Sequence, residues 1–288
     1  MNSCRIDDNR RPFTAWPLLM FPIAAPETLK VILLAVVQGI AEFLPVSSSG
    51  HLVVLNELLG TGEGSVELNV ILHLGTLLAI LVFYWRRVVA LLGADRRLIP
   101  RLIVGTLPAA VIGLVVKRNF DYLLADPLLA GCMFPLTGVL LLLLAWVKPG
   151  ERDYIQLTYG QVLVIGFAQA LALLPGVSRS GTTIVAGSLL GLERQSAATF
   201  SFLLAIPVIA GAGLLECREM LETGETTTPL GLLLLGATLS FLVGLGSLHW
   251  LVRWIEAGWL HRFAYWLIPL GVVVILWQLF FVSPAGVN

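Results

Sequence analysis

The chain has 288 residues, of which 57% are hydrophobic and only 12% are charged, and its mean hydropathy is +0.90. Soluble domains carry about 25% charged residues, so this composition excludes an ordinary soluble protein and indicates an integral membrane protein. The formal net charge is zero, which gives no reason to expect nucleic-acid binding. Three scattered cysteines provide neither a disulfide framework nor a zinc site.

Residues 1–26 differ in character from the rest of the chain. Basic residues are followed by an apolar run with four prolines, which fit the core of a signal peptide poorly. We therefore expect an irregular N-terminal tail, with residues 27–288 forming a single membrane domain.

Six apolar runs are long enough to cross a bilayer core of about 30 Å, which requires roughly 20 residues of helix. These runs are 66–85, 99–116, 123–147, 196–215, 229–252 and 263–282. The sequence therefore predicts an all-α polytopic membrane protein with about six full transmembrane spans.

Two other apolar stretches, 27–60 and 155–191, are interrupted near their middles by Pro45 and by Pro175-Gly176. Proline disfavours helix in the residue before it and removes a backbone donor, so each stretch is predicted to be two helices with a turn between them. Non-helical backbone at membrane depth is tolerated only where protein buries it or water reaches it. Each stretch is therefore expected to be a re-entrant helix pair, which enters and leaves on the same face.

The two interrupted stretches are near copies of each other. VSSSGH at 46–51 matches VSRSGT at 177–182 with an offset of 131 residues, and the same offset carries Gln38 onto Gln169. Such self-similarity indicates an internal repeat.

Three predicted spans lie between the two pairs, an odd number, so the second pair must enter from the opposite face. This pattern predicts inverted repeats, approximately 27–120 and 155–252, with a site where they meet near the midplane. The two serine-rich turns should then lie close together.

The distribution of basic residues predicts the orientation, because cytoplasmic loops are enriched in Lys and Arg. Three basic residues lie on one side, outside the N-terminal tail: Lys117, Arg118 and Arg218. Ten lie on the other side: Arg86, Arg87, Arg96, Arg97, Arg101, Lys148, Arg152, Arg194, Arg253 and Arg262. The ten-residue side is expected to be cytoplasmic, so the first helix pair opens to the outer, periplasmic face and the second opens inward.

Ionisable side chains inside a membrane are candidates for function, because each Arg, Lys or Asp costs about 2.5–3.5 kcal/mol to insert. Four such groups lie within the predicted membrane segments: Glu42, His51, His73 and Arg179. His73 lies within a long span, where an interhelical hydrogen bond is the favoured interpretation.

Gln38 and Glu42 are four residues apart and share one helix face. A carboxylate there can act as an acid or base or hold a divalent cation, with the Gln38 amide oxygen as a second ligand. A structural hydrogen bond between helices is the alternative.

Ser47, Ser48, Ser49 and Gly50 form the turn that follows. Hydroxyls and unpaired amides at a helix start favour an anion, although N-capping alone also suits serine. His51 comes next and is predicted to be a general acid, a general base or the nucleophile.

Arg179 lies in the second turn between Ser178 and Ser180, with Thr183 just beyond. The guanidinium offers a rigid fork of donors that matches phosphate oxygens, so this turn is predicted to clamp a phosphate. An ion pair with Glu42 is the alternative.

Two motifs carry a family resemblance: Gln38–His51 (QGIAEFLPVSSSGH) and Pro175–Thr183 (PGVSRSGTT). They resemble those of the undecaprenyl-diphosphatase family, bacterial membrane phosphatases associated with bacitracin resistance, and the resemblance covers essentially all of the chain after the tail. It implies a hydrolase of the inner (plasma) membrane that removes the terminal phosphate of undecaprenyl diphosphate. The monophosphate produced is the carrier lipid that cell-wall synthesis reuses.

The resemblance also implies roles for individual residues. Glu42, His51 and Arg179 are the expected catalytic residues, with Ser48 as a rival of His51 for the nucleophile. Ser48 and Ser178 would help to bind the diphosphate, assisted by a divalent cation, Mg²⁺ or Ca²⁺. Ser47, Ser49, Gly50, Ser180 and Thr183 are further expected contacts of the diphosphate. Where some members have a first glutamate, this chain has Gln38. A homodimer is a further expectation.

Two other functions compete with a phosphatase. A polyprenyl-phosphate transporter or flippase would also use inverted repeats and an anion clamp, although transport requires no Glu42 or His51 chemistry. The other is an intramembrane serine protease that uses Ser48 and His51. Peptide hydrolysis would give Arg179 no clear chemical role.

Overall fold

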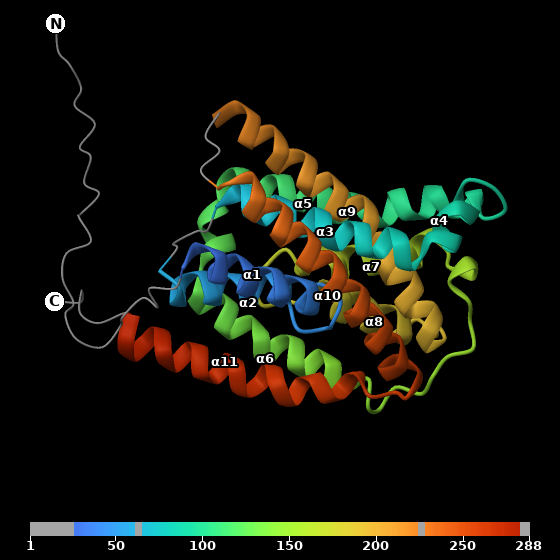
Figure 1. The fold of residues 1–288 in the computed structure, drawn as a ribbon. Helices are drawn as coiled ribbons and strands as arrows, with labels where there is room; N and C mark the ends of the chain where they lie inside the picture. Colours follow the sequence, from blue (N-terminus) through green and yellow to red (C-terminus); the bar gives the residue numbers. More distant parts are fainter. Residues whose placement is uncertain (1–25, 61–64, 224–227, 283–288) are drawn as a thin grey trace, which may run out of the picture.

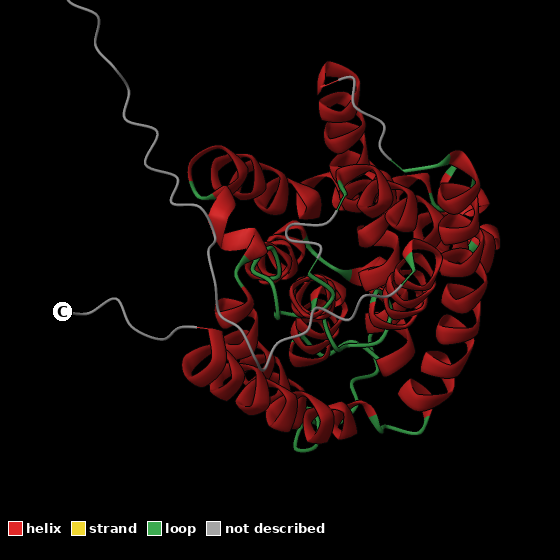
Figure 2. Cartoon of the chain, turned by 60° about the vertical axis from the view of Figure 1, so that its left-hand side comes forward, coloured by secondary structure: helices red, strands yellow, loops and turns green. Residues whose placement is uncertain are grey.

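The described part of the chain consists of helices and connecting turns, with no strand (Figure 2). The structure, a computed structural model, describes residues 26–60, 65–223 and 228–282. The α-helices are α1 (Glu27–Ala41), α2 (Ser48–Leu58), α3 (Val66–Phe83), α4 (Trp85–Leu91), α5 (Ile99–Asn119), α6 (Pro127–Leu143), α7 (Tyr159–Leu171), α8 (Arg179–Leu189), α9 (Arg194–Thr223), α10 (Leu230–Glu256) and α11 (Ala264–Trp277). The predicted all-α class is therefore confirmed, whereas the expected tail lies outside the described residues except for Pro26.

Five of the predicted spans are confirmed as helices long and apolar enough to cross a membrane. They are α3, α9 and α10, together with two helices that are extended by a short 3₁₀ turn, Arg96–Asn119 and Leu260–Val282. The outward-facing residues of α5 illustrate why these helices need lipid. Half or more of the surface of each of four apolar residues is exposed: Ile103, Leu107, Val111 and Leu114. Their spacing of three to four residues forms one apolar stripe, so the chain is a multi-pass membrane protein.

The sixth predicted span, 123–147, is shorter than expected. Asp126 caps α6 by accepting hydrogen bonds from two backbone amides, and Pro127 begins the helix, which ends at Leu143 after 17 residues. At 1.5 Å per residue α6 is about 26 Å long. The apolar residues before Asp126 belong to a separate 3₁₀ segment, Asp121–Ala125, because a cap and a proline start a new helix.

Both predicted interruptions are confirmed, and they divide each stretch into two short helices. α1 and α2 are separated by residues 42–47, and α7 and α8 by residues 172–178. In Figure 1 the members of each pair lie side by side in the middle of the helical bundle. α1 packs on α10 and α2 on α6, while α7 packs on α5 and α8 on α9, so longer helices support both turns.

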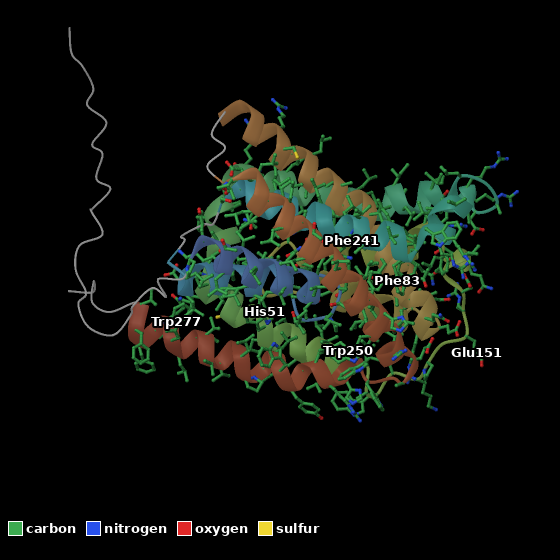
Figure 3. All side chains as sticks on the ribbon, viewed as in Figure 1. His51, Phe83, Glu151, Phe241, Trp250 and Trp277 are labelled. Carbon is green, nitrogen blue, oxygen red and sulfur yellow. The ribbon has the colours of Figure 1, made fainter. Side chains whose placement is uncertain are left out.

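The bundle has two distinct ends, which Figure 3 marks by Glu151 at one and Trp277 at the other, with His51 between them. The connection through α4 and the connection that holds Glu151 lie at the same end (Figure 1). Three longer helices, α3, α5 and α6, and the seven-residue α4 lie between the two broken pairs in the described sequence. The relation of the halves as inverted repeats, and their boundaries, stay predictions.

Candidate active site

The two serine-rich turns meet inside the bundle, as their duplication predicts. The backbone amide of Gly176 donates to Ser47 Oγ at 3.1 Å, and Ser180 Oγ donates to the Leu44 carbonyl at 3.3 Å. Residues about 130 positions apart in sequence thus share one hydrogen-bond network. The two turns therefore form one contiguous region.

Ser47 joins the turns at the cost of backbone strain. Its φ of 70° lies in the left-handed region that side chains other than glycine rarely adopt. In this conformation Ser47 Oγ accepts both from the Gly176 amide and from the Gly50 amide, the latter at 3.3 Å, and so caps α2. Strain of this kind costs of order 1–3 kcal/mol and is commonly found at functional sites.

Gly50 allows the turns to approach each other closely. A Cβ atom added at Gly50 would lie 2.6 Å from the Gly176 amide nitrogen, a distance that no ordinary contact allows. Gly176 itself has φ of +91°, which glycine adopts without strain. Thr137 of α6 then holds the second turn, because its hydroxyl donates to the Gly176 carbonyl and accepts from the Ser178 amide.

Arg179 and Glu42 form an ion pair between the two turns. Arg179 Nη2 donates to Glu42 Oε1 at 2.7 Å, and the side chains are 13% and 7% exposed. This ion pair was the alternative considered for Arg179, and it neutralises the charges of both side chains. Arg179 Nη1 has no hydrogen-bond partner among the described residues, so the guanidinium keeps a free donor for an anion.

The second oxygen of Glu42 binds the first turn. Ser48 Oγ donates to Glu42 Oε2 at 2.6 Å, and Gln38 Nε2 donates to the same oxygen at 3.1 Å. A short hydrogen bond from a hydroxyl to a carboxylate is the arrangement in which a general base activates a nucleophile. Ser48 and Glu42 are therefore positioned for this chemistry without any movement.

A cavity of about 150 Å³ lies beside these groups. Its polar lining residues are Glu42, Ser47, Ser48, Ser49, His73, Gln169, Ser178 and Arg179. The remainder is largely apolar and is lined by Ala41, Ala109, Ala172, Leu173, Val177, Val208, Ile209 and Ala212. The combination suits a ligand with an anionic head and an apolar chain.

Six of the residues predicted to act on the substrate line this cavity, and four do not. Gly50 packs against the second turn, and Ser180 bonds to Ser178 and to Leu44. Thr183 Oγ1 bonds to Ser201 Oγ at 2.6 Å and to the backbone of its own helix. For Gly50, Ser180 and Thr183, the structure gives a role in holding the turns, and their predicted contact with diphosphate stays a prediction.

His51 is the fourth predicted residue outside the cavity lining. Its Nδ1 bonds to the Ser47 carbonyl at 2.8 Å, and its Nε2 accepts from Trp266 Nε1 of α11 at 3.1 Å. The ring stacks on Trp266 and meets the edge of Phe134. Both ring nitrogens are thus occupied by partners that hold the first turn, and the predicted chemistry of His51 stays a prediction.

Three residues of the site were not predicted to belong to it. Gln169 and His73 line the cavity, and Thr137 supports the second turn. The sequence did contain a signal for Gln169, because it occupies the position in the second repeat that Gln38 occupies in the first. However, the residue four positions later is Leu173, whereas Gln38 is followed at that distance by the carboxylate of Glu42. His73 and Thr137 lie in long apolar helices, and only the packing of those helices brings them to the turns.

The described residues supply few ligands for a metal ion. They contain no group of three or more His, Cys, Asp or Glu side chains suited to one. Among the described residues, the oxygen atoms that suit a cation include the Glu42 carboxylate and the Oε1 atoms of Gln38 and Gln169, both of which are buried without a hydrogen-bond partner. Mg²⁺ commonly uses one or two carboxylates together with substrate phosphates and water, so this donor set fits a cation that is held mainly by a diphosphate.

Comparison with known proteins agrees with this architecture. Residues 31–273 match the family described as bacitracin resistance protein BacA. A protein of Rhodopirellula baltica named undecaprenyl-diphosphatase is 51% identical over 254 residues, which cover 88% of this chain and 99% of that protein. A protein of the same name from Halothermothrix orenii is 38% identical, with 87% and 98% of the two chains covered. With its paired turns, its buried ion pair and a match over most of its length, the chain belongs to the bacitracin resistance protein BacA family.

Proposed function

We propose that this protein hydrolyses undecaprenyl diphosphate to undecaprenyl phosphate and inorganic phosphate. The single observation that carries the proposal is the joining of Ser48, Glu42 and Arg179 in one cavity that also has an apolar wall. A nucleophile with its base, a phosphate-binding cation and space for a lipid chain are what this reaction requires. The names of the relatives support the same substrate. The reaction would return the carrier lipid to cell-wall synthesis, maintain cell shape and give resistance to bacitracin.

In the proposed reaction the terminal phosphate binds to Arg179 and to the hydroxyls and amides of the turns. Glu42 takes the proton of Ser48 Oγ, which attacks the terminal phosphorus in line with the leaving oxygen. The bond to the lipid-bearing phosphate breaks and undecaprenyl phosphate leaves, which produces a phosphoserine. Water then hydrolyses this ester, and the proton returns through Glu42. Positioning and charge stabilisation account for most of the catalysis of phosphoryl transfer.

Ser48 is favoured over His51 as the nucleophile for a geometric reason. Ser48 Oγ already donates to its base at 2.6 Å, whereas His51 Nε2 accepts from Trp266. We assign His51 the task of holding the Ser47 carbonyl and hence the strained turn.

We also propose that a divalent cation assists, held by Glu42 and Gln38 together with the diphosphate. When bound, it would reduce the negative charge on the phosphates. Removing divalent cations with EDTA is expected to lower phosphate release by about 100-fold, and Mg²⁺ or Ca²⁺ should restore it. Gln38→Glu adds a second carboxylate and should lower the cation concentration needed for half-maximal activity by about tenfold. Full activity in EDTA would disprove the requirement for a cation.

The proposed location is the bacterial inner membrane, with the α1–α2 turn accessible from the periplasm. The excess of Arg and Lys on the loops that flank α4 and Glu151 supports this orientation. Labelling of a cysteine introduced at Trp85 by an impermeant thiol reagent should then require that the cells be broken. The expected homodimer can be tested by the mass of the detergent-solubilised protein.

The experiment that tests the proposed function is phosphate release by the purified protein in detergent. We expect turnover of undecaprenyl diphosphate and one inorganic phosphate for each undecaprenyl phosphate. A polyprenyl-phosphate flippase remains the second candidate, because the two turns form one anion-binding region between two helix pairs. Folded protein that binds the lipid but releases no phosphate would favour the flippase over the phosphatase.

A further inference from the structure

Gln169 has a buried amide group that no other described residue satisfies. The side chain is 2% exposed, and neither Nε2 nor Oε1 has a hydrogen-bond partner. Leaving a buried amide unpaired is costly, and native proteins rarely do so without a functional reason. Gln169 also lines the cavity beside the ion pair, so this unpaired amide belongs to a residue that borders the proposed substrate site.

The repeat shows what is unusual about this glutamine. Gln38 is its counterpart in the first half, and Gln38 donates to Glu42 four residues later on the same helix face. The residue four positions after Gln169 is Leu173, so the corresponding partner is absent. The second half therefore has the amide but no carboxylate at the position that would satisfy it.

The neighbours of Gln169 indicate which part of a substrate it meets. Ala172 and Leu173 follow it just beyond the end of α7 and line the same cavity, so this stretch contributes a polar and then two apolar residues to the lining. Arg179 and Ser48 also line the cavity, and the terminal phosphate is proposed to bind to them. Gln169 therefore shares the cavity with these polar groups and is followed in sequence by two of its apolar lining residues.

We infer that Gln169 binds the lipid-bearing phosphate of the substrate, with Nε2 donating to a phosphate oxygen. This inference rests on the proposed function, because it divides the two phosphates between two sets of residues. Arg179 and the turns hold the phosphate that is transferred, whereas Gln169 holds the phosphate that leaves with the lipid. The product undecaprenyl phosphate should then depend on Gln169, and inorganic phosphate should not.

The variant Gln169→Leu tests this division, since leucine is close to glutamine in size and lacks the amide. We expect the KM for undecaprenyl diphosphate and the inhibition constant of undecaprenyl phosphate each to rise about tenfold. The inhibition constant of inorganic phosphate should not change. The Tm should not fall, because the substitution removes a polar group that has no partner among the described residues. Gln169→Asn retains the amide on a shorter side chain and should recover part of the affinity.

The control is Gln278→Leu. Gln278 is also buried with an unpaired Nε2, but it lies in the π-helical segment after α11 and not in the cavity lining. Its replacement should leave the KM and both inhibition constants as in the wild type.

Three results would overturn the inference. These are unchanged constants in Gln169→Leu, an equal rise in the inhibition constants of both products, and a Tm lowered by the substitution. If the wild type releases no phosphate, the proposed function fails, and the inference is then decided by binding of undecaprenyl phosphate to the wild type and to Gln169→Leu. Equal binding by the two proteins would overturn it, and binding weakened about tenfold by the substitution would support it.

Discussion

Arg179→Ala is expected to lower kcat/KM for undecaprenyl diphosphate by about 1,000-fold. Arg179 provides the positive charge of the site together with a free Nη1 donor, and loss of a preorganised donor costs 10²–10³ in rate. Arg179→Lys should recover only part of this loss, because an ammonium lacks the planar fork that matches phosphate. Phosphate release from the lipid in detergent measures both variants.

Stability must be separated from catalysis in this experiment, because Arg179→Ala leaves the Glu42 carboxylate without its partner. Breaking a buried pair costs about 3–5 kcal/mol when one charge remains. The double variant Arg179→Ala with Glu42→Gln should therefore recover much of the Tm and none of the activity. Wild-type phosphate release by a folded Arg179→Ala protein would contradict the proposed clamp.

Ser48→Ala is expected to reduce kcat by at least about 10⁴-fold, as the loss of a nucleophile does in other enzymes. Glu42→Gln should reduce it by about 10³-fold, since a glutamine accepts the Ser48 hydrogen bond but cannot take its proton. Acid quenching of the wild type during turnover of lipid labelled in the terminal phosphate should trap the label on Ser48, and mass spectrometry identifies the site.

Ser247→Ala is the matched control for Ser48→Ala. Ser247 is a buried serine of α10 whose hydroxyl donates to the Val243 carbonyl, away from the cavity, and its replacement should leave kcat unchanged. If Ser48→Ala remains within tenfold of the wild type while Glu42→Gln is inactive, the phosphoserine is excluded, and either water or His51 attacks the phosphorus.

Much of the architecture follows from local patterns. The apolar runs predict the long helices, because a segment that crosses a membrane must form its backbone hydrogen bonds within the segment, as a helix does. Pro45 and Pro175 predict the two turns because proline ends helices through its own geometry. The prediction for the sixth run, 123–147, was too long. Hydropathy alone does not show that a helix begins at Pro127 with Asp126 as its cap.

The site was predicted in part, and the residues that were missed share a cause. Glu42, Ser48 and Arg179 were identifiable because polar groups in apolar sequence need a reason to be there. Gln169, His73 and Thr137 are also polar residues in apolar surroundings, but their roles depend on which helix face meets the turns. No local pattern contains that information, because it is determined by packing between helices distant in sequence.

The sequence by itself determined the membrane class, the positions of the helix interruptions, the duplication and the two turns that carry the reactive groups. Only the tertiary structure decided which of those groups share a cavity. It joined Arg179 to Glu42, placed Ser48 on the carboxylate, and turned His51 toward Trp266 instead of the cavity. The physical reason is that hydropathy and proline act along the chain, whereas a hydrogen bond between residues 137 positions apart depends on where two folded segments meet.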